Sequence, residues 1–164
     1  MMKSYLLGID IGTSACKVAV FDRNGKVLAA ASGDYPVYYP HEGWAEQNPE
    51  EWWDAVCRAT KETIQKADIT ADEIAGIGID GQSWSAIPID REGNVLVNTP
   101  IWMDTRAQSI CDRLNQEIGQ EEIFEVAGNS LQPSYSTAKI LWYKRKSSGG
   151  IRKNLTKSFS PTAT

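Results

Sequence analysis

The sequence predicts an α/β fold, because segments with strand character alternate with segments that have helical spacing. Three observations carry this prediction: three consecutive short strands at the start, a long amphipathic helix, and an apolar strand after that helix. The length of 164 residues suits one domain with a sizeable core. Because the first three strands follow one another directly, the chain is not a series of simple βαβ units.

The three initial strands are predicted at residues 4–10, 16–22 and 27–31. The second of them alternates in polarity and is rich in β-branched side chains, which is typical of a strand. The turn between the second and third strands contains Asn24-Gly25, which supplies the positive φ angles of a tight hairpin. The glycine-rich segment at residues 10–14 therefore lies between two strands, and not between a strand and a helix.

A long helix is predicted to begin at residue 49 and to extend to about residue 67, since apolar residues recur there at helical spacing. Asn48 is a good N-cap and Pro49 suits the first helical position. A strand at residues 74–80 is apolar on both faces and is therefore expected to be buried. The remaining predicted elements are a helical turn at 69–73, a hairpin at 85–97, and helices at 105–118, 121–127 and 136–146.

The composition argues against several classes of protein. The 17 basic and 21 acidic residues give a net charge of −4, which does not suit a nucleic-acid-binding face. Three widely spaced cysteines without a Cys-x-x-Cys pair argue against a disulfide framework or a zinc site, and they fit a reducing cytoplasm. The initial apolar run is too short for a signal peptide or a membrane span.

The first candidate site is the segment from Gly8 to Lys17. Its glycines allow backbone amides to approach an anion closely, and its hydroxyl groups and lysine add donors and positive charge. Asp10, at a strand end, can hold Mg²⁺ through water. The segment thus predicts a nucleotide phosphate site with its metal, and a tight hairpin with an Asx cap is the alternative. It is neither a Walker A loop nor a G-x-G-x-x-G fingerprint. The candidate cofactor-binding residues are Asp10, Gly12, Thr13, Ser14 and Lys17.

Two further segments contain candidate substrate-binding residues. The first follows the strand at 74–80, and ligands of open α/β sheets bind at the carboxyl ends of strands. There Trp84 offers a flat surface on which a sugar can stack, with a core tryptophan as the alternative. In the second segment Asp104 and Arg106 suit a substrate with several hydroxyls, with helix capping by Asp104 as the alternative. The candidate residues are Gln82, Ser83, Trp84, Asp104 and Arg106.

Together these segments resemble the N-terminal part of the FGGY family of ATP-dependent carbohydrate kinases, and among them most the xylulose kinases. The resemblance covers roughly residues 4–145, with the patterns in matching order. Those patterns are Gly8-Ile-Asp10-Ile-Gly12-Thr13-Ser14-x-x-Lys17, Gly43-Trp44-x-Glu46-Gln47-x-Pro49-Glu50-x-Trp52-Trp53, Gly76-Ile-Gly78-Ile-x-Gly81-Gln82, Trp102-x-Asp104-x-Arg106 and Lys139-x-x-Trp142.

The resemblance implies an actin-like, RNase H-like ATPase fold, with residues 1–146 as an incomplete N-terminal domain. It implies ATP-dependent phosphorylation of xylulose or a related ketose or polyol, with ATP and Mg²⁺ as cofactors, in the cytoplasm. It also implies a small-molecule sugar as partner, without nucleic acid or membrane, and leaves a homodimer open for the full-length protein. Asp10 would bind hydrated Mg²⁺, the other loop residues would lie along the phosphates, and the candidate substrate residues would line the sugar pocket or lie near it.

The chain departs from the family in three ways. Xylulose kinases usually have Gln-Met-His and glycerol kinases Gln-Arg-Glu where this chain has Gln82-Ser83-Trp84, which leaves the sugar open. The general base, an Asp, is expected in a segment that this chain lacks, so the chain alone is expected to be inactive. A non-catalytic sugar-binding or regulatory module is the alternative function. Residues 147–164 are expected to form an aberrant, disordered tail, and we hypothesise a frameshift or sequencing error that the DNA around codons 144–147 tests.

Overall fold

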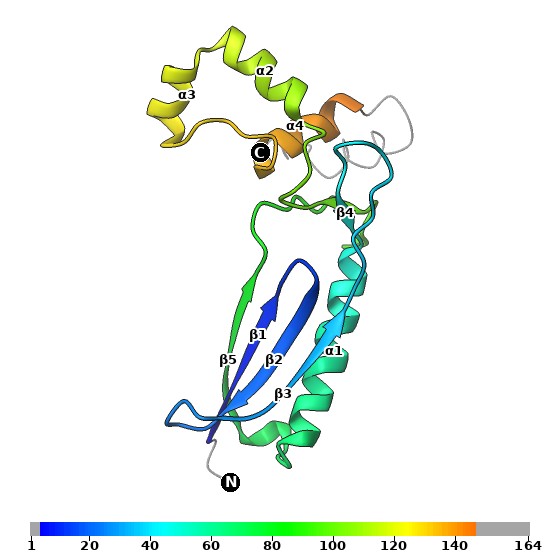
Figure 1. The fold of residues 1–164 in the computed structure, drawn as a ribbon, viewed down its shortest axis with the longest axis vertical. Coiled ribbons are helices and arrows are strands. Elements are labelled where there is room, and N and C mark those ends of the chain that lie inside the picture. The colour runs from blue at the N-terminus through cyan, green and yellow to red at the C-terminus, as the bar shows by residue number, and fades with distance from the viewer. Residues whose placement is uncertain (1–3, 147–164) are drawn as a thin grey trace. The chain divides into compact units, whose positions relative to one another are not determined.

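The computed structural model describes residues 4–146 (Figure 1). The tail predicted at residues 147–164 lies outside the described residues. The described chain forms two compact units, one of residues 4–37 and 49–82, the other of residues 38–48 and 83–146. No helix within residues 4–146 combines the length and the apolar character that crossing a membrane requires.

The first unit is a four-stranded sheet with one long helix (Figure 1). Its strands are β1 (Tyr5–Ile11), β2 (Ala15–Phe21), β3 (Val27–Asp34) and β5 (Ile74–Gly81), in the spatial order β3-β2-β1-β5. The first three form an antiparallel meander, and β5 pairs with β1 in parallel. The predicted meander is thus confirmed, although β3 continues three residues beyond the predicted end at residue 31.

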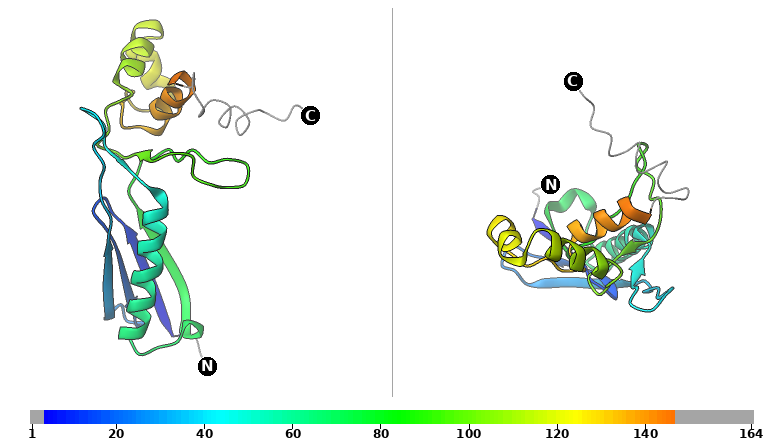
Figure 2. Two further views of the ribbon diagram at one scale, coloured as in Figure 1. Left: turned by 90° about the vertical axis from the view of Figure 1, so that its right-hand side faces the viewer. Right: turned by 90° about the horizontal axis from the view of Figure 1, so that it is seen from above.

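Helix α1 (Pro49–Lys66) packs on β2 and β3 (Figure 2). The core between them contains Val18 and Val20 from β2 and Ala55 and Ala59 from α1, each at most 1% exposed. The approach is close because β3 carries Gly33 at this point, where an added Cβ would lie 3.0 Å from the Cβ of Ala55. Small residues on both sides therefore set the separation of helix and sheet.

Strand β5 lies at an edge of this sheet, after a short 3₁₀ turn at Ala71–Glu73. The prediction that it is buried on both faces is wrong for the described residues, since Ile77 and Ile79 are 61% and 70% exposed. The register pairs them with Leu7 and Ile9, so they point to the same side of the sheet as the core. Helix α1 packs mainly on β2 and β3, however, and leaves the β5 end of this face uncovered.

The second unit has a two-stranded sheet and three helices. Strand β4 (Glu46–Gln47) pairs antiparallel with β6 (Thr99–Pro100), and the helices are α2 (Gln108–Glu117), α3 (Gln120–Ala127) and α4 (Ser136–Lys146). The three predicted helices are confirmed, with α2 three residues shorter at its start than predicted. The small sheet has no sequence signal, because two residues per strand show no alternation.

The second predicted hairpin, at residues 85–97, is only partly present. Its turn exists, because the Asp90 carboxylate accepts the backbone N–H groups of Glu92 and Asn94 at 3.0 and 2.7 Å. The flanking residues form an isolated bridge between Ile89 and Val95 in place of two strands. Pro88 next to this bridge has no N–H and cannot donate to a ladder, which explains why the pairing ends there.

Candidate functional site

The loop between β1 and β2 is a tight turn in the first unit. The Gly12 N–H donates to the carbonyl of Ala15 at 3.0 Å, and an added Cβ at residue 12 would lie 3.1 Å from that same oxygen. This close contact explains why glycine suits the position. Thr13 is part-buried and Ser14 is exposed, so the two predicted hydroxyl groups lie at the loop's tip in different environments.

Tyr35 supports this loop, and it is a residue that the sequence analysis missed. Its hydroxyl donates to the carbonyl of Gly12, and its backbone N–H donates to the carbonyl of Ser14 at 3.4 Å. Burial, with smaller contributions from Cys16 and Asp10, raises the pKa of Tyr35 to about 12. The hydroxyl therefore keeps its proton and remains a donor. Tyr35 stands just after β3 in a segment rich in proline and tyrosine, which carried no signal beyond that of a loop.

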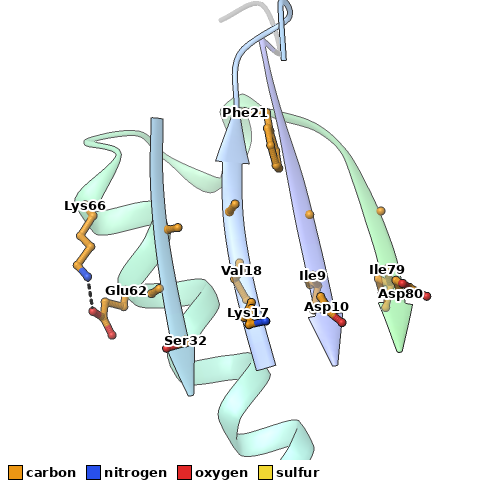
Figure 3. A pocket seen from close by; sticks show the side chains of 15 residues that line it. Ile9, Asp10, Lys17, Val18, Phe21, Ser32, Glu62, Lys66, Ile79 and Asp80 are labelled. Carbon is orange, nitrogen blue, oxygen red and sulfur yellow. Dashed lines mark ion pairs between the residues drawn. The ribbon is translucent and has the colours of Figure 1, made fainter. Parts of the chain in front are cut away.

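Three charged side chains, those of Lys17, Asp10 and Asp80, lie next to one another on the adjacent strands β2, β1 and β5 (Figure 3). In the register Asp10 pairs with Lys17 on β2 and with Asp80 on β5, and Lys17 pairs with Ser32 on β3. Paired residues point to one side of a sheet, and this is the side opposite the core and α1. All four side chains are exposed. The two carboxylates and the ammonium thus form a polar row at the carboxyl ends of the parallel strands.

This polar row lines an open cavity of about 1030 Å³ (Figure 3). Small residues make its floor, since Gly8 and Gly78 pair with each other in the register beside Ala19. An added Cβ at Gly8 would lie 3.1 Å from the ring of Phe21, and one at Gly78 would meet no atom within 4 Å. The glycines therefore widen the cavity, whose lining includes the two carboxylates and the ammonium of the polar row.

Gln82 joins the loop from the end of β5. Its backbone N–H donates to the carbonyl of Ile11 at 2.9 Å, and its side-chain amide donates to the carbonyl of Gly12 at 3.5 Å. The sequence grouped Gln82 with Ser83 and Trp84, but the structure brings it to the β1–β2 loop in the first unit. Ser83 and Trp84 belong to the second unit.

Asp104 and Arg106 form an ion-pair network in the second unit. The Asp104 carboxylate is fully buried and accepts hydrogen bonds from the Ala45 N–H at 2.7 Å and from Nε of Arg106 at 2.9 Å. Nη2 of Arg106 lies 2.8 Å from Glu46. The alternative role of Asp104 as a helix cap is wrong, because α2 begins at Gln108 with Ala107 as its N-cap. The network instead fastens residues 45–46 to residues 104–106.

Two tryptophan rings enclose the Arg106 guanidinium. Its Cζ lies 3.7 Å from the centroid of Trp44 and 5.2 Å from that of Trp142, and the Arg106 side chain is only 3% exposed. Such stacking adds to the ion pairs. The charged groups of Asp104 and Arg106 are therefore bonded to other protein groups, and these contacts hold the surrounding segments together. Trp44 and Glu46 belong to one of the patterns on which the family resemblance rests, and their contacts here are packing contacts.

Trp84 has an unusual backbone and an accessible side chain. Its φ is 68°, in the left-handed region that non-glycine residues adopt rarely, and it is 47% exposed. Its ring centroid lies 5.0 Å from that of Tyr135. The alternative of a core tryptophan therefore does not hold in this structure. The two rings form an aromatic wall in the second unit.

Lys139 on α4 is fully buried. Its ammonium donates to the carbonyl of Trp84 at 3.0 Å and to that of Ile101 at 2.8 Å. Burial lowers the pKa of Lys139 to about 8, an effect that Arg106 strengthens and Asp104 opposes. In the sequence Lys139 stood out only through the family pattern, because a lysine in an amphipathic helix normally faces solvent.

An antiparallel meander, a parallel fourth strand and a glycine turn beside acidic strand ends are features that this chain shares with sugar kinases of the actin-like ATPase fold. The chain belongs to the FGGY family of carbohydrate kinases, because residues 5–159 match the N-terminal domain of that family. The predicted family and fold class are thus confirmed.

Individual relatives agree with this assignment. The chain is 36% identical to a glycerol kinase of Rhizobium meliloti over 142 residues, which cover 86% of this chain and 29% of that protein. It is 34% identical to a xylulose kinase of Bacillus subtilis over 140 residues, which cover 85% of this chain and 28% of that protein. The ligand-bound xylulose kinase of Lactobacillus acidophilus superimposes with a TM-score of 0.80 at 32% identity, covering 87% of this chain and 28% of that one. The chain therefore spans less than a third of these relatives.

Proposed function

We propose that this chain supplies the N-terminal part of a kinase that transfers the γ-phosphoryl group of ATP to a hydroxyl of a small sugar or polyol. The observation that carries the proposal is the polar row of Asp10, Lys17 and Asp80 beside the glycine turn. Similarity to xylulose and glycerol kinases at nearly equal identity makes a ketose and a polyol the two substrate classes to test. We further propose that residues 1–146 form this domain and that it acts in the cytoplasm.

The residues of the loop suit a nucleotide phosphate. The Lys17 ammonium is exposed on the cavity side of the sheet, where it can pair with a phosphate oxygen. Gly12, Thr13 and Ser14 would lie along the phosphates with their backbone and hydroxyl groups. The hydrogen bond from the Tyr35 hydroxyl to the Gly12 carbonyl already holds the loop in place, so phosphate binding need not order it.

The same row fits a hydrated Mg²⁺ ion. Asp10 and Asp80 are neighbours in the register and both are exposed, and Mg²⁺ in phosphoryl transfer is commonly held by one or two carboxylates with several waters. Asp10 is the better ligand of the two, because one oxygen of Asp80 already accepts the N–H of Gly81 at 2.9 Å. When bound, the ion would neutralise charge that develops on the transferred phosphoryl group.

We propose that Ser83 and Trp84 in the second unit contact the sugar, and we keep Gln82, which bonds the β1–β2 loop in the first unit, as a further candidate for sugar binding. The half-exposed Trp84 indole offers an apolar face of the kind on which sugar rings and chains pack. We propose that Asp104 and Arg106 lie near this site, with their side chains held by protein partners. The general base would come from elsewhere in the whole protein, so the 164-residue chain alone is proposed to bind its ligands without turnover.

A chimera tests the proposal. Residues 5–146 replace the matching segment of the Bacillus subtilis xylulose kinase or of the Rhizobium meliloti glycerol kinase, and ATP consumption is measured with pentuloses, hexuloses and polyols. We expect phosphorylation of at least one compound, with the parental kinases as controls. Folded chimeras that phosphorylate none of the panel, together with a 164-residue chain that binds none of it in calorimetry, would contradict the proposal.

A further inference from the structure

We infer that Lys139 is a positioning residue that fixes the main chain of Trp84 and thereby the aromatic wall formed with Tyr135. The inference that this wall faces a sugar rests on the proposed function, whereas the positioning of Trp84 does not. The geometry is direct: one buried ammonium bonds the carbonyl of Trp84 at 3.0 Å and the carbonyl of Ile101 at 2.8 Å. Lys139 thus ties a loop residue to a fully buried residue next to β6.

The backbone of Trp84 needs such a partner. A residue with a side chain at a φ of 68° persists only where its surroundings hold it there. A hydrogen bond from a charged donor to its carbonyl is stronger than a neutral one and fixes the orientation of the peptide group. The indole is 47% exposed, and among the rings of residues 4–146 it packs on that of Tyr135. Because ring packing is so limited there, much of the orientation of the indole depends on the backbone of Trp84.

An apolar side chain could fill the space that Lys139 occupies, so the presence of a buried ammonium there needs an explanation. Burying an ammonium costs free energy unless it is bonded, and the two carbonyls supply those bonds. The charged groups that act on it are Asp104, which favours the ammonium, and Arg106, which disfavours it. The pKa of Lys139, lowered to about 8, places its deprotonation within a range where proteins stay folded. Deprotonation leaves two N–H donors but removes the charge that strengthens both bonds.

The test uses the 164-residue chain labelled with 5-fluorotryptophan. The ¹⁹F signal of Trp84 is assigned with Trp84→Phe and followed in Lys139→Met and in Arg145→Met, which removes an exposed charge from the same helix. Xylulose and glycerol are titrated into each variant by calorimetry. We expect Lys139→Met to shift or broaden the Trp84 signal and to weaken binding of the preferred compound roughly tenfold, equivalent to one strong hydrogen bond. Arg145→Met should change neither.

A pH titration of the wild-type chain adds a readout that does not depend on a variant. The Trp84 signal should change between pH 6.5 and 9.5 with a midpoint near 8, and this change should be absent from Lys139→Met. If Lys139→Met does not fold, the wild-type titration decides. A wild-type Trp84 signal that is flat over this range, or a folded Lys139→Met with unchanged signal and affinity, would overturn the inference. Failure of any sugar to bind, with the Trp84 signal behaving as expected, would contradict the proposed function and leave the positioning supported.

Discussion

Replacing Arg106 with methionine should be among the most destabilising single changes in the second unit. The substitution leaves the Asp104 carboxylate buried at 0% exposure without its charged partner, and it removes the 2.8 Å contact with Glu46. Breaking a buried pair in this way costs about 3–5 kcal/mol. Loss of the stacking on Trp44 adds to this by roughly 1 kcal/mol, since the methionine keeps the apolar contact but not the charge.

Urea unfolding of the 164-residue chain measures this effect. Arg113→Met is the matched control, because Arg113 pairs with Glu117 on α2 while both side chains are about half exposed, and its loss should cost less than about 0.5 kcal/mol. Arg106→Lys keeps the charge but loses the bidentate contact with Asp104. Its loss of stability should lie between those of Arg106→Met and Arg113→Met. A cost below about 1 kcal/mol for Arg106→Met, or an equal cost for Arg113→Met, would contradict a buried ion pair of this strength.

Four further predictions follow from other parts of the molecule. In the active chimera Asp10→Asn should lower kcat at least about a hundredfold in the coupled assay, with the unfolding free energy nearly unchanged, and near wild-type turnover would remove Asp10 from the metal site. Trp84→Ala should raise KM for the sugar more than KM for ATP, whereas a lower melting temperature with both constants unchanged would make Trp84 a purely structural residue. The exposed apolar residues of β5 should make the 164-residue chain self-associate, and Ile79→Lys, at a position 70% exposed, should reduce this self-association in light scattering; an equally associated variant would show that another surface is responsible. Because the pKa of Lys139 is lowered, the unfolded chain binds more protons than the folded one between pH 8 and 10.5. The unfolding free energy should therefore rise with pH in this range by up to roughly 3 kcal/mol relative to that of Lys139→Met. Parallel curves of unfolding free energy against pH for the two chains would contradict the lowered pKa.

The sequence predicted those parts of the fold whose signals are local. Alternation and Asn24-Gly25 identify the meander, and the helical spacing of apolar residues after Asn48 and Pro49 identifies α1. The burial of β5 could not be predicted, because the same apolar pattern occurs whether or not a second layer covers the strand, and α1 packs mainly on β2 and β3. The small sheet of β4 and β6 depends on pairing between residues some fifty positions apart, which no local pattern records.

The candidate site shows the same division. Asp10 and Lys17 could be placed together from sequence, since they flank one tight turn. Asp104 and Arg106 could be recognised as a pattern, but whether their charges serve a ligand or the protein depends on burial and on Glu46, sixty residues earlier. Tyr35 and Lys139 act through backbone carbonyls of distant residues, and any residue type can offer such a carbonyl.

The bond between the Ala45 N–H and Asp104 has a consequence for the order of assembly. The two residues are 59 positions apart, and between them lie all of α1 and β5, which belong to the other unit. During synthesis the segment at residues 38–48 therefore emerges long before its partners and must wait while α1 and β5 are made. Closing so long a loop has an entropic cost and favours slow formation. Both units are discontinuous along the chain, but the first can form its meander from residues 5–34 alone. A nascent chain released before residue 106 would carry Trp44 and Glu46 without the arginine that joins them.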